Sequence, residues 1–190
     1  FDNNLYDYFY NNVSIFYENK NKFVRYKNYD LPDGKIYDFL VKDYFIIISG
    51  LIIKKSILEK ENYFNEEYNI IGDYDLIMRI SKYAFAKALN KPLIFYRVHK
   101  NNFSKLHDKM YFDEYNNWFN FQYNKNDLDF KKNKFFFLLK LNKLELIYLL
   151  YKKKNFSLLV KIIKLPHFGL KIKFLLAFLL PLKLINFFRK

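Results

Sequence analysis

The sequence contains no cysteine among its 190 residues. Disulfide bonds and cysteine-ligated metal sites are therefore excluded, although this absence says nothing about the cellular compartment. Long uncharged apolar runs are also missing. The longest one near the C-terminal end is the nine-residue segment 174–182, whereas a transmembrane helix needs about 20 apolar residues. No charged segment followed by an apolar stretch and a small-residue cleavage site opens the chain, so we expect no signal peptide.

Arginine is scarce as well, with 4 residues against 29 lysines. Nucleic-acid-binding surfaces usually carry Arg on a polar face, whereas the basic residues here are interleaved with apolar ones, so we expect no nucleic-acid partner. The sequence has no Gly-rich phosphate loop, no zinc-ligand spacing and no Ser-His-Asp set. Two Asp-x-Asp triplets occur, at 73–75 and 127–129, but a chain with this much Asp contains about one by chance.

The positive charge is concentrated at one end of the chain. Residues 1–130 carry 18 basic and 18 acidic side chains, whereas residues 131–190 carry 15 basic and one acidic side chain. The whole net charge of +14 therefore lies in the last 60 residues. We expect two regions, a domain over residues 1–126 and a basic amphipathic helical tail over residues 127–190.

The apolar patterns predict a mixed α/β chain. We expect one or two helices in 1–31, a turn at 31–34, a short helix at 37–44, a strand buried on both faces at 45–53, a helix at 56–63 capped by Ser56, a helix from Asp73 to about Tyr83, one or two strands at 86–98 with a kink at 90–92, a long helix from 101 to about 122, and helices at 135–151, 156–165 and 168–188. Gly50, inside the predicted strand, indicates a close backbone approach, either to neighbouring protein atoms or to a ligand.

The densest group of carboxylates lies between Phe64 and Ser81. Within it, Asp73 is placed where a loop turns into a helix, and Gly72 precedes it. A carboxylate at such a position suits a general base, but Asp is also a common helix N-cap, and the residues alone favour the cap. Asp75 is four residues before Arg79, a spacing typical of an ion pair on a helix.

Residues 64–104 resemble the closing half of a family 2 glycosyltransferase catalytic domain. The matching segments are 64–66 (FNE), 72–76 (GDYDL) with Arg79, and 91–99 (KPLIFYRVH), followed by Ser104. Many members of this family have Glu at the position of Gly72. The chain begins with Phe1, and the resemblance implies a fragment of a GT-A domain without its N-terminal, donor-binding half.

The resemblance also implies a function and a set of site residues. The full-length enzyme would transfer a sugar from a nucleotide-sugar donor to a sugar or lipid-linked acceptor, in cell-envelope polysaccharide synthesis, with Asp73 as general base. Gly50, Gly72, Asp75 and Trp118 would contact substrate, although the apolar stripe containing Trp118 favours a core position. His99 is either structural or a ligand of a divalent metal (Mn²⁺ or Mg²⁺), which the missing half would mainly bind.

The basic tail indicates a further partner. Its lysines flank apolar residues, so we expect peripheral attachment to an anionic membrane surface at the inner face of the cell membrane, in the cytoplasm. The alternative is that these helices pack on the domain as an ordinary amphipathic cap. A non-enzymatic, basic membrane-binding module is the alternative to the glycosyltransferase interpretation.

Overall fold

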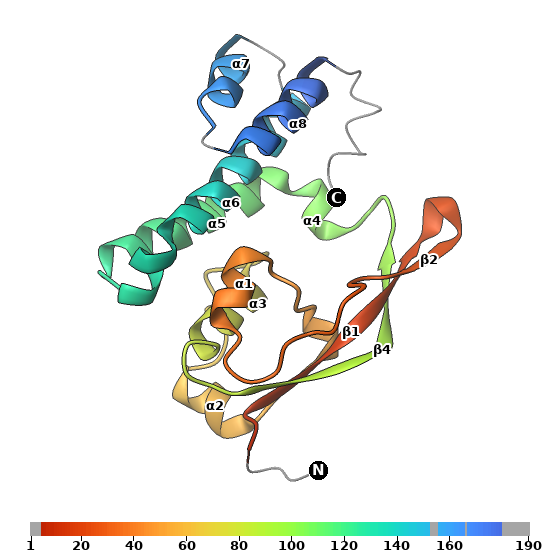
Figure 1. Cartoon of the computed structure of the whole chain (residues 1–190), viewed down its shortest axis with the longest axis vertical. Helices are drawn as coiled ribbons and strands as arrows, with labels where there is room; N and C mark the ends of the chain where they lie inside the picture. Colours follow the sequence, from red (N-terminus) through yellow and green to blue (C-terminus); the bar gives the residue numbers. More distant parts are fainter. Residues whose placement is uncertain (1–4, 153–155, 166, 180–190) are drawn as a thin grey trace. The chain divides into compact units, whose positions relative to one another are not determined.

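The computed structural model describes residues 5–152, 156–165 and 167–179. The chain divides into two compact units, Phe1–Leu106 and His107–Lys190. The first unit contains a four-stranded mixed sheet with helices, and the second contains helices only in its described part. The predicted α/β class is therefore correct (Figure 1).

Strand β1 (Tyr8–Tyr17) is the centre of the sheet. Strand β4 (Ala86–Val98) pairs with β1 in parallel along its whole length. The other edge of β1 is shared by β3 (Leu51–Ile53) and β2 (Lys22–Arg25), and both run antiparallel to β1. Figure 1 shows β1 and β4 as the long pair of strands in the first unit.

The prediction of helices in residues 1–31 is wrong, because residues 8–25 form β1 and β2 joined by a short 3-10 helix, η1 (Glu18–Lys20). Phe9, Val13 and Phe16 recur at a helical spacing, but the same segment is rich in aromatic and β-branched residues, which favour strands. Tyr8 and Tyr10 lie on one face of β1 and are buried. This alternation, rather than the helical spacing, matches the burial at the start of the strand.

Residues 86–98 form one strand with an irregularity at the predicted kink. The register shifts between the pair Asn11–Leu89 and the pair Asn12–Pro92, so β4 bulges at Asn90 and Lys91. Proline cannot donate a ladder hydrogen bond, and a bulge is one of the places where a sheet accommodates it. The predicted kink at 90–92 is confirmed as this bulge.

The helices of the first unit follow the predictions unevenly. The described ones are α1 (Tyr37–Lys42), α2 (Lys55–Lys60), α3 (Gly72–Ile80) and α4 (Phe103–Leu106). The short helix at 37–44 and the helix of the central motif are confirmed. Lys54 rather than Ser56 occupies the N-cap position of α2. The doubly buried strand at 45–53 is wrong, because only 51–53 is a strand and the 3-10 helix η2 (Ile48–Gly50) precedes it.

The second unit contains α5 (Asp108–Asn124), α6 (Leu128–Lys152), α7 (Phe156–Ile163) and α8 (Phe168–Leu179). The long helix predicted from residue 101 is therefore interrupted at His107, between α4 and α5. The predicted boundary at 126/127 falls between α5 and α6, which pack against each other within the second unit. The last part of the helix predicted at 168–188 lies outside the described residues. In the described part of the chain, no helix is long and apolar enough to cross a membrane.

Candidate active site

Helix α3 begins with Gly72 and Asp73 of the motif. Ile71 is at the N-cap position and makes no side-chain capping bond, so Gly72 and Asp73 are the first two helical residues. Among the described glycines, only Gly34 has a positive φ, so Gly72 does not supply an unusual backbone conformation. A β-carbon built on Gly72 would meet no atom within 4 Å, which leaves open space beside Asp73.

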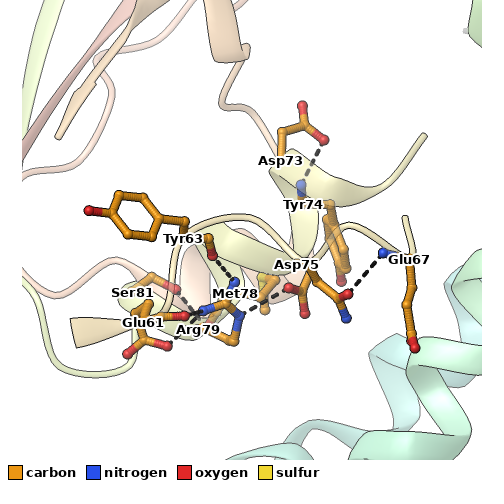
Figure 2. A network of polar contacts seen from close by, with 10 residues as sticks. Glu61, Tyr63, Glu67, Asp73, Tyr74, Asp75, Met78, Arg79 and Ser81 are labelled. Atoms are coloured by element: carbon orange, nitrogen blue, oxygen red, sulfur yellow. Dashed lines mark hydrogen bonds and ion pairs between the residues drawn. The ribbon is translucent and has the colours of Figure 1, made fainter. Parts of the chain in front are cut away.

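Asp73 is half-buried in the first turn of α3. Its Oδ1 accepts a hydrogen bond from the backbone N–H of Tyr74 at 2.7 Å. This bond is made inside the helix, so Asp73 is not the N-cap that the residues alone favoured. Figure 2 shows its carboxylate pointing away from the side of α3 that carries Asp75 and Arg79. The positive end of the helix dipole favours a negative charge at this position.

Asp75, by contrast, belongs to an ion-pair network inside the first unit. Its Oδ2 accepts a hydrogen bond from Arg79 Nε at 3.0 Å, and its side chain is only 5% exposed. Arg79 Nη1 also donates to the carboxylate of Glu61 at 2.9 Å and to its backbone carbonyl at 2.7 Å, while Nη2 donates to the carbonyl of Tyr63 at 2.8 Å. The pair predicted between Asp75 and Arg79 is confirmed, and we call this set of four residues the Arg79 clasp (Figure 2).

The Arg79 clasp holds the end of α2 against α3. Helix α2 ends in a Schellman arrangement, in which Asn62 N–H bonds to Glu59 O at 3.1 Å and Tyr63 N–H bonds to Leu58 O at 2.9 Å. Asn62 and Tyr63 have φ angles of 54° and 62°, a region that bulky residues rarely adopt. Arg79 binds the carbonyls on either side of Asn62, so it stabilises this strained turn.

Gly50 approaches another part of the protein closely. A β-carbon at this position would lie 1.9 Å from Asn11 Oδ1 and 3.3 Å from Ile94 Cδ1. No L-residue with a side chain fits there without moving Asn11. The sequence allowed either protein atoms or a ligand as the close neighbour of Gly50. In the structure, the neighbours are protein atoms, those of Asn11 and Ile94.

Asn11 and Asn12 are the polar residues of this region that the sequence pattern did not indicate. Both are buried at the point where β4 bulges. Asn12 Nδ2 donates to Lys27 O at 2.9 Å, and its Oδ1 accepts from Val13 N at 2.9 Å. Asn11 Nδ2 donates to Asn12 O at 2.8 Å. These amides fill the irregular part of the sheet. In the sequence, the two consecutive Asn residues inside an apolar segment were the feature that could have indicated this irregularity.

His99 follows the end of β4 and is half-buried. Its backbone N–H donates to Asn102 Oδ1 at 2.6 Å, and Asn102 Nδ2 donates to Arg97 O at 3.2 Å. Asn102 therefore holds the turn after the strand. In the described residues, no three or more His, Asp or Glu side chains gather as a metal site. The donor atoms of the described residues alone do not form a site for the divalent metal.

Trp118 lies in the second unit, in the aromatic contact between α5 and α6. Its ring centroid is 5.4 Å from that of Phe137 and 5.6 Å from that of Tyr115, and a third ring, that of Phe130, is 6.1 Å away. The indole is buried. Trp118 therefore occupies the core position that the apolar stripe favoured.

No family model, no curated protein and no solved structure gives a significant match to this chain. Function must therefore be inferred from the sequence motifs and from the geometry around Asp73.

Proposed function

We propose that this chain is the acceptor-side half of a family 2, GT-A-type glycosyltransferase and that Asp73 is its general base. The observation that supports this proposal is the difference in burial and in hydrogen-bond partners between the two aspartates of the motif. Asp75 is buried and paired with Arg79, so it is committed to structure. Asp73 is half-buried on another side of the same helix, with open space beside it at Gly72.

The rigidity of the surroundings suits the proposed role. A general base must be held within hydrogen-bonding reach of the proton that it removes. The Arg79 clasp fixes the last turn of α3 to the end of α2, and the hydrogen bond from Tyr74 N–H orients the Asp73 carboxylate in the first turn.

In the proposed reaction, an acceptor hydroxyl donates its proton to Asp73 as its oxygen attacks the anomeric carbon of the donor sugar. The bond between that carbon and the diphosphate oxygen breaks, the nucleoside diphosphate leaves with the electron pair, and the anomeric configuration inverts. We propose that the donor and the divalent metal, Mn²⁺ or Mg²⁺, bind to residues outside this sequence. The acceptor is a sugar or lipid-linked sugar of cell-envelope polysaccharide synthesis.

The test is the replacement of Asp73 by Asn in the full-length enzyme. We expect kcat to fall by about a hundredfold or more, the scale of a lost general base, while the KM for the donor stays within about twofold. Glu67→Gln is the matched control, because it removes one negative charge from the exposed loop before α3 and should leave kcat unchanged. Near-normal turnover of the Asp73→Asn enzyme would show that Asp73 is not the general base and has only a structural role at the start of α3.

We further propose that the second unit attaches the enzyme to the anionic, cytoplasmic face of the cell membrane. The support is the concentration of basic residues after residue 130, together with large exposed apolar side chains in α7 and α8. The same observation favours a second candidate function, a non-enzymatic membrane-binding module. Asp73→Asn kinetics separate the two, because such a module has no turnover to lose.

A further inference from the structure

Helix α8 carries apolar side chains on two sides. Its inner side contributes the buried Phe174 to a core formed with Leu146, Leu158, Ile162 and Leu165 of α6, α7 and the residues that follow α7. Leu170 and Phe178 pack against the same core. The inner side therefore accounts for the attachment of α8 to the rest of the second unit.

The other side of α8 is apolar but uncovered. Its large exposed side chains are Phe168, Ile172, Leu176 and Leu179, whose exposed fractions lie between 43% and 78%. We call these four residues the outer face. At about 100° per residue, they fall within an arc of about 80°, whereas the buried Phe174 lies on the opposite side of the helix. A helix that buries one apolar side and exposes another in a stripe has a second surface in need of a partner.

Lysines border the outer face on both sides. Lys171 and Lys173 are placed about 100° to either side of the centre of the stripe, and both are half-exposed. No acidic residue occurs between Phe156 and Leu179. This arrangement fits an anionic surface with an apolar interior, because lysine stems can lie along the apolar region while their ammonium groups reach the charged layer.

We infer that the outer face of α8 is the surface that enters the headgroup region of an anionic lipid bilayer. This inference rests on the membrane attachment proposed above and names the residues that perform it. A helix of 12 residues is about 18 Å long, which is shorter than the apolar core of a bilayer, about 30 Å. It therefore lies in the plane of the membrane with its inner side still packed on α6 and α7.

The experiment compares paired variants for partition onto phosphatidylcholine vesicles with and without phosphatidylglycerol. The outer-face variant is Phe168→Gln with Leu179→Gln, and the matched control is Phe121→Gln with Leu128→Gln. Both pairs remove one exposed Phe and one exposed Leu from helices of the second unit, and Gln preserves helix propensity. Fluorescence of the buried Trp118, the one tryptophan in the sequence, checks that the second unit is folded in each variant.

We expect the wild-type chain to bind vesicles that contain phosphatidylglycerol, and to bind them less as salt rises. The outer-face variant should lose about tenfold or more in partition coefficient, because two apolar side chains no longer enter the bilayer. The control pair should stay within about twofold of the wild type. Lys171→Gln with Lys173→Gln should weaken binding to the anionic vesicles and remove most of its salt dependence.

Different failures have different meanings. If the wild type binds anionic vesicles and the outer-face variant binds equally well, another surface attaches the protein, and the inference is wrong while membrane attachment stands. If the wild type binds neither kind of vesicle, or binds neutral vesicles equally well at every salt concentration, the inference and the proposed attachment both fail. If the outer-face variant instead abolishes self-association in the absence of lipid, the partner is a second copy of this chain.

A second readout uses the absence of native cysteine. Leu179→Cys and Leu128→Cys replace leucines of similar exposure, 78% and 81%, and each can be labelled with an environment-sensitive dye. We expect a blue shift of the dye on anionic vesicles at position 179 only. A shift at both positions, or at neither, contradicts a lipid-facing α8.

Discussion

Removal of the Arg79 side chain should destabilise the first unit strongly. Arg79→Ala deletes four hydrogen bonds, two to carboxylates and two to backbone carbonyls. The Asp75 carboxylate is 5% exposed and that of Glu61 is 18% exposed, so both lose their ion pair where water replaces it poorly. Breaking a buried pair in this way costs about 3–5 kcal/mol. Because Arg79 itself is partly exposed, we expect a loss of about 3 kcal/mol in the free energy of unfolding.

The assay is urea denaturation followed by far-ultraviolet circular dichroism, with amide hydrogen exchange of residues 72–80 as the local probe. Arg97→Ala is the matched control. Arg97 pairs with Glu18 at 3.1 Å in the same unit, but both side chains are largely exposed, so its removal should cost roughly 0–1 kcal/mol. Arg79→Lys should fall between the two, because an ammonium group cannot bind all four acceptors of the guanidinium.

The two probes also define the result that would refute this reasoning. Arg79 lies in the first unit, so exchange of residues 72–80 should accelerate in Arg79→Ala and change little in Arg97→Ala. If Arg79→Ala costs no more than Arg97→Ala, the clasp contributes nothing beyond a surface pair, and the rigid support proposed for Asp73 is absent.

Four further predictions concern the first unit and its proposed partners. Tyr10 Oη donates to Pro32 O at 2.5 Å, whereas the buried hydroxyl of Tyr8 has no partner in the described part of the chain; denaturation should show that Tyr10→Phe costs about 1 kcal/mol and that Tyr8→Phe costs nothing or stabilises. Burial raises the pKa of both phenols. Their contribution to stability is therefore complete below the unfolded pKa of about 10 and is lost as the pH rises further. The melting temperature should consequently fall less steeply with increasing pH in Tyr8→Phe than in the wild type. Gly72→Ala should raise the melting temperature, since the built β-carbon meets no atom and Ala gains about 0.4–1 kcal/mol over Gly. In calorimetry with Mn²⁺ and UDP- or GDP-sugars, the 190-residue chain should show no micromolar binding, and a dissociation constant in that range would contradict our placement of the donor site on other residues.

The sequence predicted the elements whose signals were long and unambiguous. The helix that begins at Gly72 and the strand from Ala86 to Val98 were found because each has a sustained pattern of one period. The segment from Tyr8 to Tyr17 was predicted as helix because its apolar residues fit both periods, and only pairing with a strand almost 80 residues away decides between them. Such long-range pairing leaves no local signal.

The same limit applies to the candidate site. The pair between Asp75 and Arg79 was predictable from a spacing of four residues. The contacts of Arg79 with Glu61 and Tyr63 were not, because they depend on the left-handed turn at Asn62 and Tyr63. The covered position of Trp118 followed from its apolar stripe. The uncovered outer face of α8 could not be predicted, because the sequence shows which residues are apolar but not which side of the helix the core takes.

The central claim, that Asp73 removes a proton from the acceptor, is tested most directly by the pH dependence of kcat in the full-length enzyme. A carboxylate base works only when deprotonated, so wild-type kcat should fall tenfold for each pH unit below the pKa of the base. The residual kcat of Asp73→Asn should be lower by about a hundredfold or more and should lack this acid limb. The same acid limb in Asp73→Asn and in the wild type would contradict the account, because the titrating base would then be another group.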